Sequence, residues 1–327
     1  MNDKVSIIIP CFNGENTIDR AIQSVYDQKY RNTELIVVDD GSTDRSKDHI
    51  FVWKEKFEVE NQSLIYVHQA NKGLGGAVNT GLKEVSGDYL MLLDADDEFL
   101  PGAISKRVSY LEDHPECHVV RSNGYICRGE HKFLFVYEED EKHCQDVFSA
   151  LLRGETNNWA GSYMIRTKAL FAFYPDREIF TSRSGQNLQM LLPVTYQRAC
   201  GFIDEPLMNY IQQENSLSQI SNSPELEKKR KLENAAGYRE IREHMLRQIV
   251  QNSAEYEKYH QMILGGYWRA VMMLAIEYDD RTLLKQAKTG IAQSGEARIQ
   301  DKIMYYKHVF PPMAVLIRII NKLHHVI

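Results

Sequence analysis

The strongest constraint on the fold comes from two short apolar runs that each end in a group of aspartates. Residues 34–38 read ELIVV and precede Asp39 and Asp40, and residues 89–93 read YLMLL and precede Asp94 and Asp96. Apolar runs of this length without alternation are typical of strands buried on both faces of a parallel sheet. Ligands of open α/β sheets bind beyond the carboxyl ends of the strands. The sequence therefore predicts an α/β fold with an acidic ligand site at that edge.

The remaining chain indicates further strands and helices in alternation, followed by a change of composition. Strands are expected at 5–9, 64–68, 118–121, 124–128, 132–137 and 200–203, and helices at 16–28, 77–85, 144–153 and 188–197. The segment SLSQISNSP at 216–224 marks a boundary, beyond which the chain is charged and helical. We expect an α/β domain at 1–218 and a helical region at 219–327.

Composition excludes several classes of protein. The chain carries 39 basic and 45 acidic side chains, a net charge of −6, which disfavours nucleic-acid binding. Its five cysteines form no C-x-x-C pair, which argues against a zinc site and against a disulfide framework. The apolar run before Pro10 is too short for a signal peptide, and no stretch of about 18 apolar residues predicts a membrane span. A cytoplasmic protein is expected.

The spacing of Asp94 and Asp96 suits a divalent cation. Mg²⁺ or Mn²⁺ is held by one or two protein carboxylates when a substrate diphosphate supplies further oxygens. Such an ion neutralises charge on a departing diphosphate. A D-x-D pair is common and can be a solvated turn. Its place after a buried strand, behind the second pair Asp39 and Asp40, favours a functional site.

Two other segments suggest contacts to a nucleotide. Asp40, followed by Gly41 in a tight turn, can accept a hydrogen bond from a base N–H or a ribose hydroxyl. Residues 71–79 (NKGLGGAVN) are rich in glycine, so backbone amides can approach a ligand closely. The segment is neither G-x-G-x-x-G nor a Walker loop, which excludes dinucleotide-binding and P-loop readings.

Taken together, these segments resemble the family 2 glycosyltransferases of the GT-A fold. Five blocks occur in the family's order: VSIIIPCFN at 5–13, ELIVVDDGSTD at 34–44, N-x-G…A-x-N-x-G at 71–81, GDYLMLLDADDEFLP at 87–101 and FIDEPL…ENSLS at 202–218. The resemblance implies a Rossmann-like, mainly parallel sheet flanked by helices, here with an all-α C-terminal extension. It implies metal-dependent, inverting transfer of a sugar from a nucleotide sugar, usually UDP-linked, in the synthesis of a cell-surface polysaccharide. The acceptor would be a glycan or a lipid-linked saccharide.

The same resemblance assigns the donor site. Pro10, Phe12 and Asp40 would line the nucleoside pocket, Asp94 would lie beside the ribose and the metal, and Asp96 would bind Mn²⁺ or Mg²⁺. The full set of residues expected to bind the donor is Pro10, Phe12, Asn13, Asp40, Gly73, Asn79, Asp94, Ala95 and Asp96.

Two positions depart from the family pattern. Val78 stands where members commonly carry an arginine before the residue that matches Asn79, so no diphosphate contact is assigned there. Members also carry the catalytic base as the Asp of a Glu-Asp pair that opens a helix, and this chain has Gln186 and Asn187 instead. Neither amide accepts a proton at neutral pH.

Three explanations of the amide pair remain open. Asp176 or Glu178 can supply the base, or the amides position the acceptor while a base from elsewhere acts. Alternatively, the domain is a non-catalytic module that binds a sugar nucleotide and partners an active transferase. A nucleotidyltransferase would require a basic, glycine-rich loop after the first strand, and residues 11–15 contain neither Arg nor Lys.

The C-terminal segment has a composition of its own. Residues 302–327 contain four Lys or Arg side chains and no acids, and beyond Pro311 and Pro312 the apolar residues recur at helical spacing. Such a segment can lie on an anionic membrane surface, or it can dock onto neighbouring helices or a second subunit.

Overall fold

The computed structural model of the chain describes residues 3–181, 185–212 and 223–310. It divides into two compact units, Met1–Leu151 with Thr156–Ile220 and Leu152–Glu155 with Ser221–Ile327. The expected boundary at 218/219 and the expected helix beyond Pro312 lie outside the described residues.

The first unit is built on one mixed sheet. Within the described residues its strands follow the order β3-β2-β1-β4-β8-β6-β9-β5, with β7 paired to β6. Their bounds are β1 Val5–Cys11, β2 Thr33–Asp39, β3 Ser63–His68, β4 Tyr89–Leu92, β5 Glu98–Phe99, β6 Val119–Arg128, β7 His131–Leu134, β8 Tyr163–Arg166 and β9 Cys200–Ile211. Strands β1 to β4 are parallel, whereas β8 runs antiparallel to β4 and β6. Strands β6 and β9 form a further parallel pair, and each antiparallel pair among the described residues involves β5, β7 or β8. The sheet is therefore mainly parallel, as expected, with antiparallel strands added to it.

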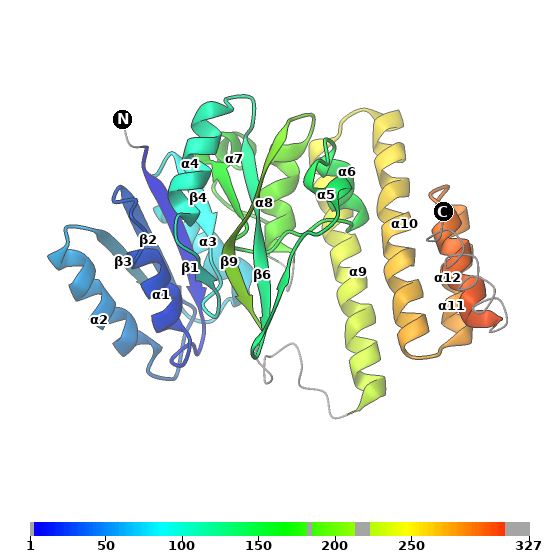
Figure 1. Cartoon of the computed structure of the whole chain (residues 1–327), viewed down its shortest axis with the longest axis horizontal. Helices are drawn as coiled ribbons and strands as arrows, with labels where there is room; N and C mark the ends of the chain where they lie inside the picture. Colours follow the sequence, from blue (N-terminus) through cyan, green and yellow to red (C-terminus); the bar gives the residue numbers. More distant parts are fainter. Residues whose placement is uncertain (1–2, 182–184, 213–222, 311–327) are drawn as a thin grey trace, which may run out of the picture. The chain divides into compact units, whose positions relative to one another are not determined.

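Helices cover both faces of this sheet. Those of the first unit are α1 Ile18–Tyr26, α2 Ser46–Val59, α3 Gly73–Glu84, α4 Ala103–Asp113, α5 Glu139–Lys142, α6 Val147–Arg153, α7 Thr167–Phe173 and α8 Gln186–Thr195. Figure 1 shows α1 and α3 on opposite faces of the parallel strands. The crossovers explain this, because successive right-handed connections move β1 to β2 to β3 and then return to β4 on the other side.

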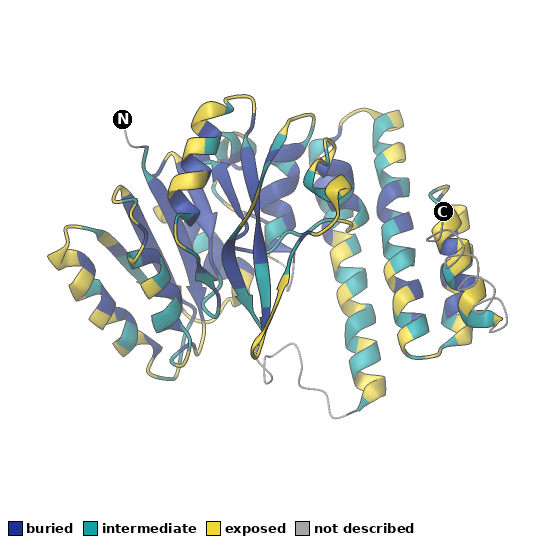
Figure 2. Ribbon diagram, viewed as in Figure 1, coloured by how far each residue is buried: buried dark blue, intermediate teal, exposed yellow. Residues whose placement is uncertain are grey.

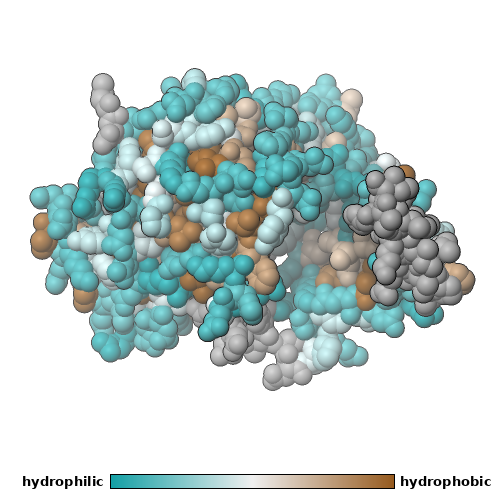
Figure 3. Space-filling model, in the orientation of Figure 1, coloured by the Kyte–Doolittle hydropathy of each residue, from teal (hydrophilic) through white to brown (hydrophobic). Residues whose placement is uncertain are grey.

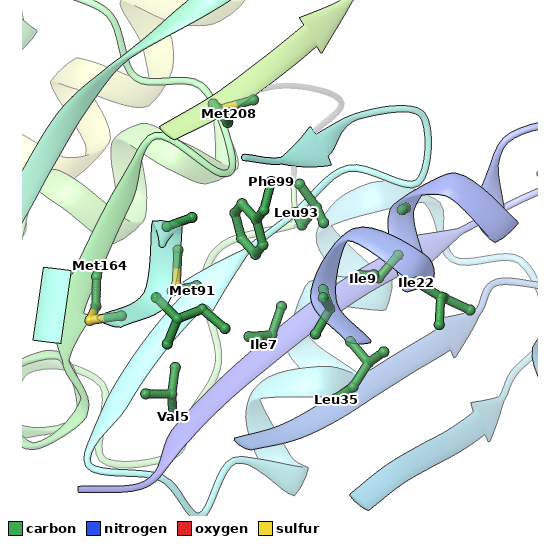
Figure 4. Close-up of a cluster of buried hydrophobic side chains, with 14 of the residues drawn as sticks. Val5, Ile7, Ile9, Ile22, Leu35, Met91, Leu93, Phe99, Met164 and Met208 are labelled. Atoms are coloured by element: carbon green, nitrogen blue, oxygen red, sulfur yellow. The ribbon is translucent and has the colours of Figure 1, made fainter. Parts of the chain in front are cut away.

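The core fixes the position of the strand ends. Every residue of β1, β2 and β4 is buried, and the sheet strands are the darkest ribbons in Figure 2. On the α1 face, Ile7 and Ile9 of β1 pack with Ile22 of α1 and Met91 of β4 (Figure 4). Leu93 and Phe99, which flank the aspartates after β4, belong to the same cluster. The acidic turn is thus anchored at both ends by buried side chains.

Three expected elements differ from those observed. Helix α3 begins at Gly73 rather than at residue 77, so the glycine-rich segment forms its first turns. The expected strands 118–121 and 124–128 form one strand, β6. Strand β9 continues to Ile211 through Pro206, and its register against β6 shifts between Ser122 and Asn123. Such an irregularity accommodates a residue without a backbone N–H.

The second unit is helical throughout its described residues. Its helices are α9 Pro224–Ile249, α10 Ser253–Glu277, α11 Arg281–Gln293 and α12 Ile299–Val309. A separate core joins α10, α11 and α12 through Val271, Leu284, Ile291 and Tyr305. No helix among the described residues combines the length and hydropathy needed to cross a bilayer.

The short segment Leu152–Glu155 belongs to this second unit. The Arg153 Nε atom lies 2.9 Å from the Glu296 Oε2 atom, and Glu155 forms ion pairs with Arg269 and Arg298 at 3.5 and 2.7 Å. A Cβ added to Gly266 of α10 would lie 2.2 Å from the carbonyl oxygen of Arg153, so the two backbones touch. These contacts bind a piece of chain from the middle of the sequence into the helical unit.

Candidate active site at the carboxyl edge of the sheet

The parallel register brings the acidic segments to one edge. Cys11 at the end of β1 pairs with Asp39 at the end of β2, and Ile8 pairs with Leu92 at the end of β4. The residues that follow these strands therefore emerge at the same edge, with the β1 end between the other two. Asp40 lies on one side of Phe12 and Asn13, and the turn from Asp94 to Asp97 lies on the other.

The two aspartates after β2 have different environments. Asp39 is buried and accepts hydrogen bonds from the Ser42 N–H at 2.8 Å and from the Tyr66 hydroxyl at 2.7 Å. Burial raises the pKa of Asp39, but these hydrogen bonds outweigh it and hold the pKa below its usual value. Asp39 is thus a structural carboxylate.

Asp40 directly follows β2 at this edge and is held by two hydrogen bonds. Its Oδ1 atom accepts from the Gln69 amide at 2.6 Å and from the backbone N–H of Lys72 at 2.8 Å. Both bonds end on one oxygen of a side chain that is only 3% exposed, so the carboxylate is held in a fixed orientation. A fixed, buried acceptor of this kind suits a base N–H or a ribose hydroxyl.

The loops after β1 and β2 are joined to each other. Asn13 has a left-handed backbone (φ 51°), and its Oδ1 atom accepts from the Thr43 N–H at 2.9 Å. The Asn13 N–H in turn donates to the Ser42 hydroxyl at 3.0 Å. Phe12 is 46% exposed beside them, whereas Pro10 is buried inside β1. Asn13 therefore acts mainly by shaping the loop, and Phe12 presents the accessible ring.

The turn after β4 holds three aspartates, Asp94, Asp96 and Asp97, which receive few hydrogen bonds from described residues. Burial and the charge of Asp96 raise the pKa of Asp94 to about 7, and burial raises that of Asp96. Ala95 lies between them and packs partly on the core. Asp97 is fully buried. Its Oδ1 atom accepts from the Ile211 N–H at 2.9 Å, and its Oδ2 atom has no partner among the described residues. Burial, then Asp94 and Asp96, raise the pKa of Asp97 well above its usual value.

Arg20 of α1 supports this turn from behind. Its Nη2 atom donates to the backbone carbonyl of Asp96, and its Nε atom lies 3.9 Å from a carboxylate oxygen of Glu98. The guanidinium also opposes the rise in the pKa of Asp96. Arg20 thus fixes the backbone directly after Asp96, and its positive charge acts on Asp96 and Asp97.

Asn187 reaches the acidic turn through Tyr163. The Tyr163 hydroxyl donates to the Asn187 Oδ1 atom at 2.6 Å, and this tyrosine is only 1% exposed. Burial and then the negative charge of Asp94 raise the pKa of Tyr163, which places its ring near that carboxylate. Gly185, with φ 85°, caps the helix that carries Gln186 and Asn187. The amide pair therefore opens α8 at the same edge as the aspartates.

Comparison with known proteins decides the family. The sequence model of glycosyl transferase family 2 matches residues 6–180, more than half of the chain. The chain belongs to glycosyl transferase family 2.

Curated relatives in this family match over limited segments. The glycosyltransferase GlyA of Streptococcus pneumoniae is 37% identical over 117 residues, which is 35% of this chain and 16% of GlyA. An uncharacterized glycosyltransferase of Rickettsia conorii is 28% identical over 216 residues, 63% of this chain and 33% of the relative. The matches thus span no more than a third of the length of these two relatives.

Solved family structures share the fold. Residues 1–349 of TarS from S. aureus superpose with a TM-score of 0.61 at 16% identity, covering 96% of this chain and 83% of TarS 1–349. The mannosyltransferase PcManGT of Pyrobaculum calidifontis gives 0.54 at 15% identity, covering 97% and 87%. The fold is therefore GT-A, a mixed α/β sheet with helices, followed by a helical C-terminal region.

Asp176 and Glu178, the two acids suggested as substitutes for the family's base, do not lie at the carboxyl edge of the sheet. Glu178 is exposed and forms an ion pair with Lys83 at 2.6 Å, at the C-terminal end of α3. Arg177 between them donates to the carbonyl of Val85, shortly before β4 begins. Asp176 and Glu178 therefore lie at the amino edge of the sheet, opposite Asp94. The hydrogen bond and charge of Lys83 also lower the pKa of Glu178, which makes it a weaker base.

Two of the residues expected to bind the donor, Gly73 and Asn79, belong to helix α3. The Asn79 side chain bonds the backbone of Ile179 twice, with its Nδ2 donating to the carbonyl at 2.9 Å and its Oδ1 accepting from the N–H at 2.8 Å. Asn79 thus anchors the segment that leads toward α8. Gly73 opens α3 with φ 74° and no atom within 4 Å of an added Cβ, so its surroundings leave room for a ligand.

Asp94 and Asp96 fit a divalent ion whose other ligands come from a substrate. Among the described residues no group of three or more His, Cys, Asp or Glu is placed to hold a metal ion. Asp94 and Asp96 instead supply hard oxygen donors whose mutual repulsion the surrounding protein leaves largely uncompensated. That combination fits Mg²⁺ or Mn²⁺ completed by diphosphate oxygens.

Proposed function

We propose that this protein is a metal-dependent, inverting glycosyltransferase that acts on a UDP-sugar. Its acceptor is a glycan or a lipid-linked saccharide used in cell-surface polysaccharide synthesis, and it works in the cytoplasm or at the inner face of the cell membrane. The observation that carries the proposal is the pair Asp94 and Asp96, short of positive partners, at the same edge as the oriented carboxylate of Asp40.

The donor has a defined place in this scheme. Asp40 accepts a hydrogen bond from the uracil edge and Phe12 lies against the nucleoside. Asp94 lies beside the ribose and the ion, and Asp96 binds the ion. A bound ion would neutralise the charge that develops on the departing diphosphate. TarS is known in complex with UDP-GlcNAc, and PcManGT in complex with GDP-Man and Mn²⁺, which supports a nucleotide-sugar donor and a divalent metal.

The acceptor side depends on the hydrogen bond between Tyr163 and Asn187. Because the Tyr163 hydroxyl donates to Asn187 Oδ1, the amide NH₂ group of Asn187 is turned away from that bond and is available to orient an acceptor oxygen. With Asp176 and Glu178 at the opposite edge, we favour the explanation in which the amides position the acceptor and a base from elsewhere takes the proton. Trp159, stacked on Tyr210 with ring centroids 5.4 Å apart, adds an aromatic surface for a sugar ring.

A donor screen tests the proposal. UDP release is measured for a panel of UDP-sugars with Mn²⁺, with and without EDTA, alongside UDP binding by calorimetry. We expect metal-dependent binding of UDP and slow, metal-dependent hydrolysis of one donor. Tight binding without release from any donor, even with saccharide acceptors added, would instead support the non-catalytic module. Absence of UDP binding would contradict both.

Substitution of Asn187 sharpens the question of the base. Asn187→Asp places a carboxylate at the position where family members carry the base. We expect it to raise the rate of transfer, with a pH profile that follows ionisation of the new acid. Asn187→Ala is the matched control and should lower the rate, because it removes the orienting amide. If Asp and Ala have the same effect, Asn187 does not face the acceptor.

A further inference from the structure

Helix α12 exposes a continuous apolar stripe. Ile299, Ile303, Tyr306 and Phe310 are 74%, 42%, 42% and 55% exposed. Their spacing of four, three and four residues places them on one face of the helix. The opposite face carries Tyr305, which is buried in the core shared by α10, α11 and α12. The exposed stripe is therefore a different face of α12 from the one that packs in the core.

A basic groove runs beside this stripe. It lies between α11 and α12, has a volume of about 570 Å³, and is lined by Lys285, Lys288, Thr289, Ala292, Gln293 and Tyr305. The Lys288 Nζ atom lies 4.2 Å from the centre of the Tyr305 ring and 4.8 Å from that of Tyr306, which joins the groove to the stripe. None of these lining residues is acidic, so the groove suits an anionic group.

The charges around the stripe are also positive in balance. Lys302 and Lys307 are exposed on α12, and no described acid forms an ion pair with them. The neighbouring acids are already paired. Asp301 bonds Arg269 at 3.1 Å, and Asp279 bonds His308 at 3.0 Å. The exposed surface of α11 and α12 thus combines apolar side chains with lysines that lack acidic partners in the described structure.

We propose that the stripe and groove of α11 and α12 dock on a membrane surface that contains anionic lipids. The four lysines would meet lipid phosphates while Ile299, Ile303 and Phe310 enter the boundary between headgroups and acyl chains. Charge disfavours the other occupants. A second copy in a symmetric dimer would bring the same lysines face to face, and residues 311–327 contain Arg318 and Lys322 but no acid.

This inference stands apart from the proposed reaction, because lipid binding needs no donor. Figure 3 shows hydrophobic residues at the surface near both α2 and the α11–α12 end of the chain, and α2 supplies a matched control. Val52 and Val59 of α2 are 55% and 80% exposed, but the exposed acids Asp48, Glu55 and Glu58 share their helix. Exposed apolar residues mixed with acids should not bind anionic lipid.

Sedimentation with vesicles tests the inference on the full chain. Vesicles of phosphatidylcholine alone are compared with vesicles that also contain the anionic lipid phosphatidylglycerol. We expect binding only to the anionic vesicles and release at high salt. The triple variant Ile299→Ser/Ile303→Ser/Phe310→Ser and the pair Lys285→Glu/Lys288→Glu should each weaken partitioning at least about tenfold. The control Val52→Ser/Val59→Ser should bind as the wild type does.

Several results would overturn the inference. One is equal binding to both kinds of vesicle, or to neither. Another is anionic binding that the α11 and α12 substitutions leave unchanged, which would assign it to a different segment. A third is self-association in sedimentation velocity that the triple variant abolishes, because the stripe would then contact a second copy. Unchanged melting temperature and UDP binding in each variant would confirm that the fold and the donor site are intact.

Discussion

The amino edge of the sheet and the turn after β4 give buried acids opposite environments. At the amino edge, Glu34 is 2% exposed and receives hydrogen bonds from Ser6, from both the N–H and the hydroxyl of Ser86, and from the Lys4 ammonium group at 2.5 Å. Burial raises the pKa of Glu34, but the hydrogen bonds from these donors outweigh burial, so the pKa lies below its usual value. At the carboxyl edge, the pKa values of Asp94, Asp96 and Asp97 are all raised.

The difference distinguishes an acid that stabilises the fold from the acids that we propose to bind a metal ion. A carboxylate surrounded by its own donors contributes to folding and has little left to offer a ligand. A group of carboxylates with one nearby guanidinium is destabilising until a cation arrives. The sheet therefore carries a well-paired carboxylate at its amino edge and a group of poorly paired carboxylates in the turn after β4.

The largest effect should follow removal of that charge. Asp96→Asn keeps the size of the side chain but removes its charge as a metal ligand. We expect UDP binding in Mn²⁺ to weaken at least about 100-fold, since the ion is the main link to the diphosphate. Thermal stability without metal should stay the same or rise, because repulsion with Asp94 is relieved. Calorimetry and thermal melts measure the two quantities, and unaltered UDP affinity would contradict the metal assignment.

The mirror-image change at the amino edge should affect stability alone. Glu34→Gln leaves the Lys4 ammonium and a serine donor without an ionised acceptor, at a cost of about 1.5–3 kcal/mol in the free energy of unfolding. UDP affinity should be unchanged. Denaturant titration measures the first and calorimetry the second. A loss of UDP affinity in this variant would remove the distinction between the edges.

The same variant gives a pH test. The pKa of Glu34 in the folded protein lies below its ordinary value of 4.5, so the stability that its charge contributes is present above about that pH. It is lost as the pH falls through the folded pKa. The wild type should therefore lose more stability than Glu34→Gln between neutral pH and strongly acidic pH. If the free energy of unfolding falls equally with pH in the two proteins, Glu34 is not held ionised by its partners.

A smaller effect is expected behind the metal site. Arg20→Met removes the hydrogen bond to the Asp96 carbonyl, so the backbone that directly follows Asp96 is less well fixed. We expect metal-dependent UDP binding to weaken roughly tenfold, as is usual for residues that orient metal ligands. Arg20→Lys keeps the charge but lacks the planar set of donors of the guanidinium. Its affinity for UDP should lie between that of the wild type and that of Arg20→Met. If Lys and Met bind UDP equally, the position of the turn does not depend on this hydrogen bond.

The smallest effect should come from the surface acid at the amino edge. Glu178→Gln breaks an exposed ion pair with Lys83, which is screened by solvent. We expect unchanged donor hydrolysis, unchanged transfer and an unchanged melting temperature. A fall in turnover with normal UDP binding would instead restore Glu178 as a candidate base.

The parts of the fold that sequence predicts well are those with an unbroken local pattern. The apolar runs that end in Asp39 and Leu92 appear as strands β2 and β4 because every residue in them is buried. Helix α2 shows no such pattern, because exposed Phe51, Val52 and Val59 alternate with the buried face and hide its period. Helix α2 therefore forms because of its packing in the folded protein and not because of a local sequence pattern.

The site divides in the same manner. Asp94 and Asp96 are two residues apart, so a short motif reveals them, although their roles remain predictions. Arg20 and Asp96 are 76 residues apart, and Tyr163 and Asn187 are 24 apart. Neither pair leaves a local signature, since only folding brings the partners together. Asp97 stood in the visible D-A-D-D run, but only its burial shows that it anchors β9 rather than the ion.

The segment Leu152–Glu155 has a consequence for how the chain folds during synthesis. Arg153 and its partner Glu296 are separated by 143 residues, and Arg298 and Arg269, the partners of Glu155, also lie far downstream. A growing chain therefore completes the whole sheet before this segment acquires its contacts. Until residues 296–298 have been made, Arg153 lacks its partner Glu296 and Glu155 lacks its partner Arg298. The final helices thus complete a part of the molecule made long before them.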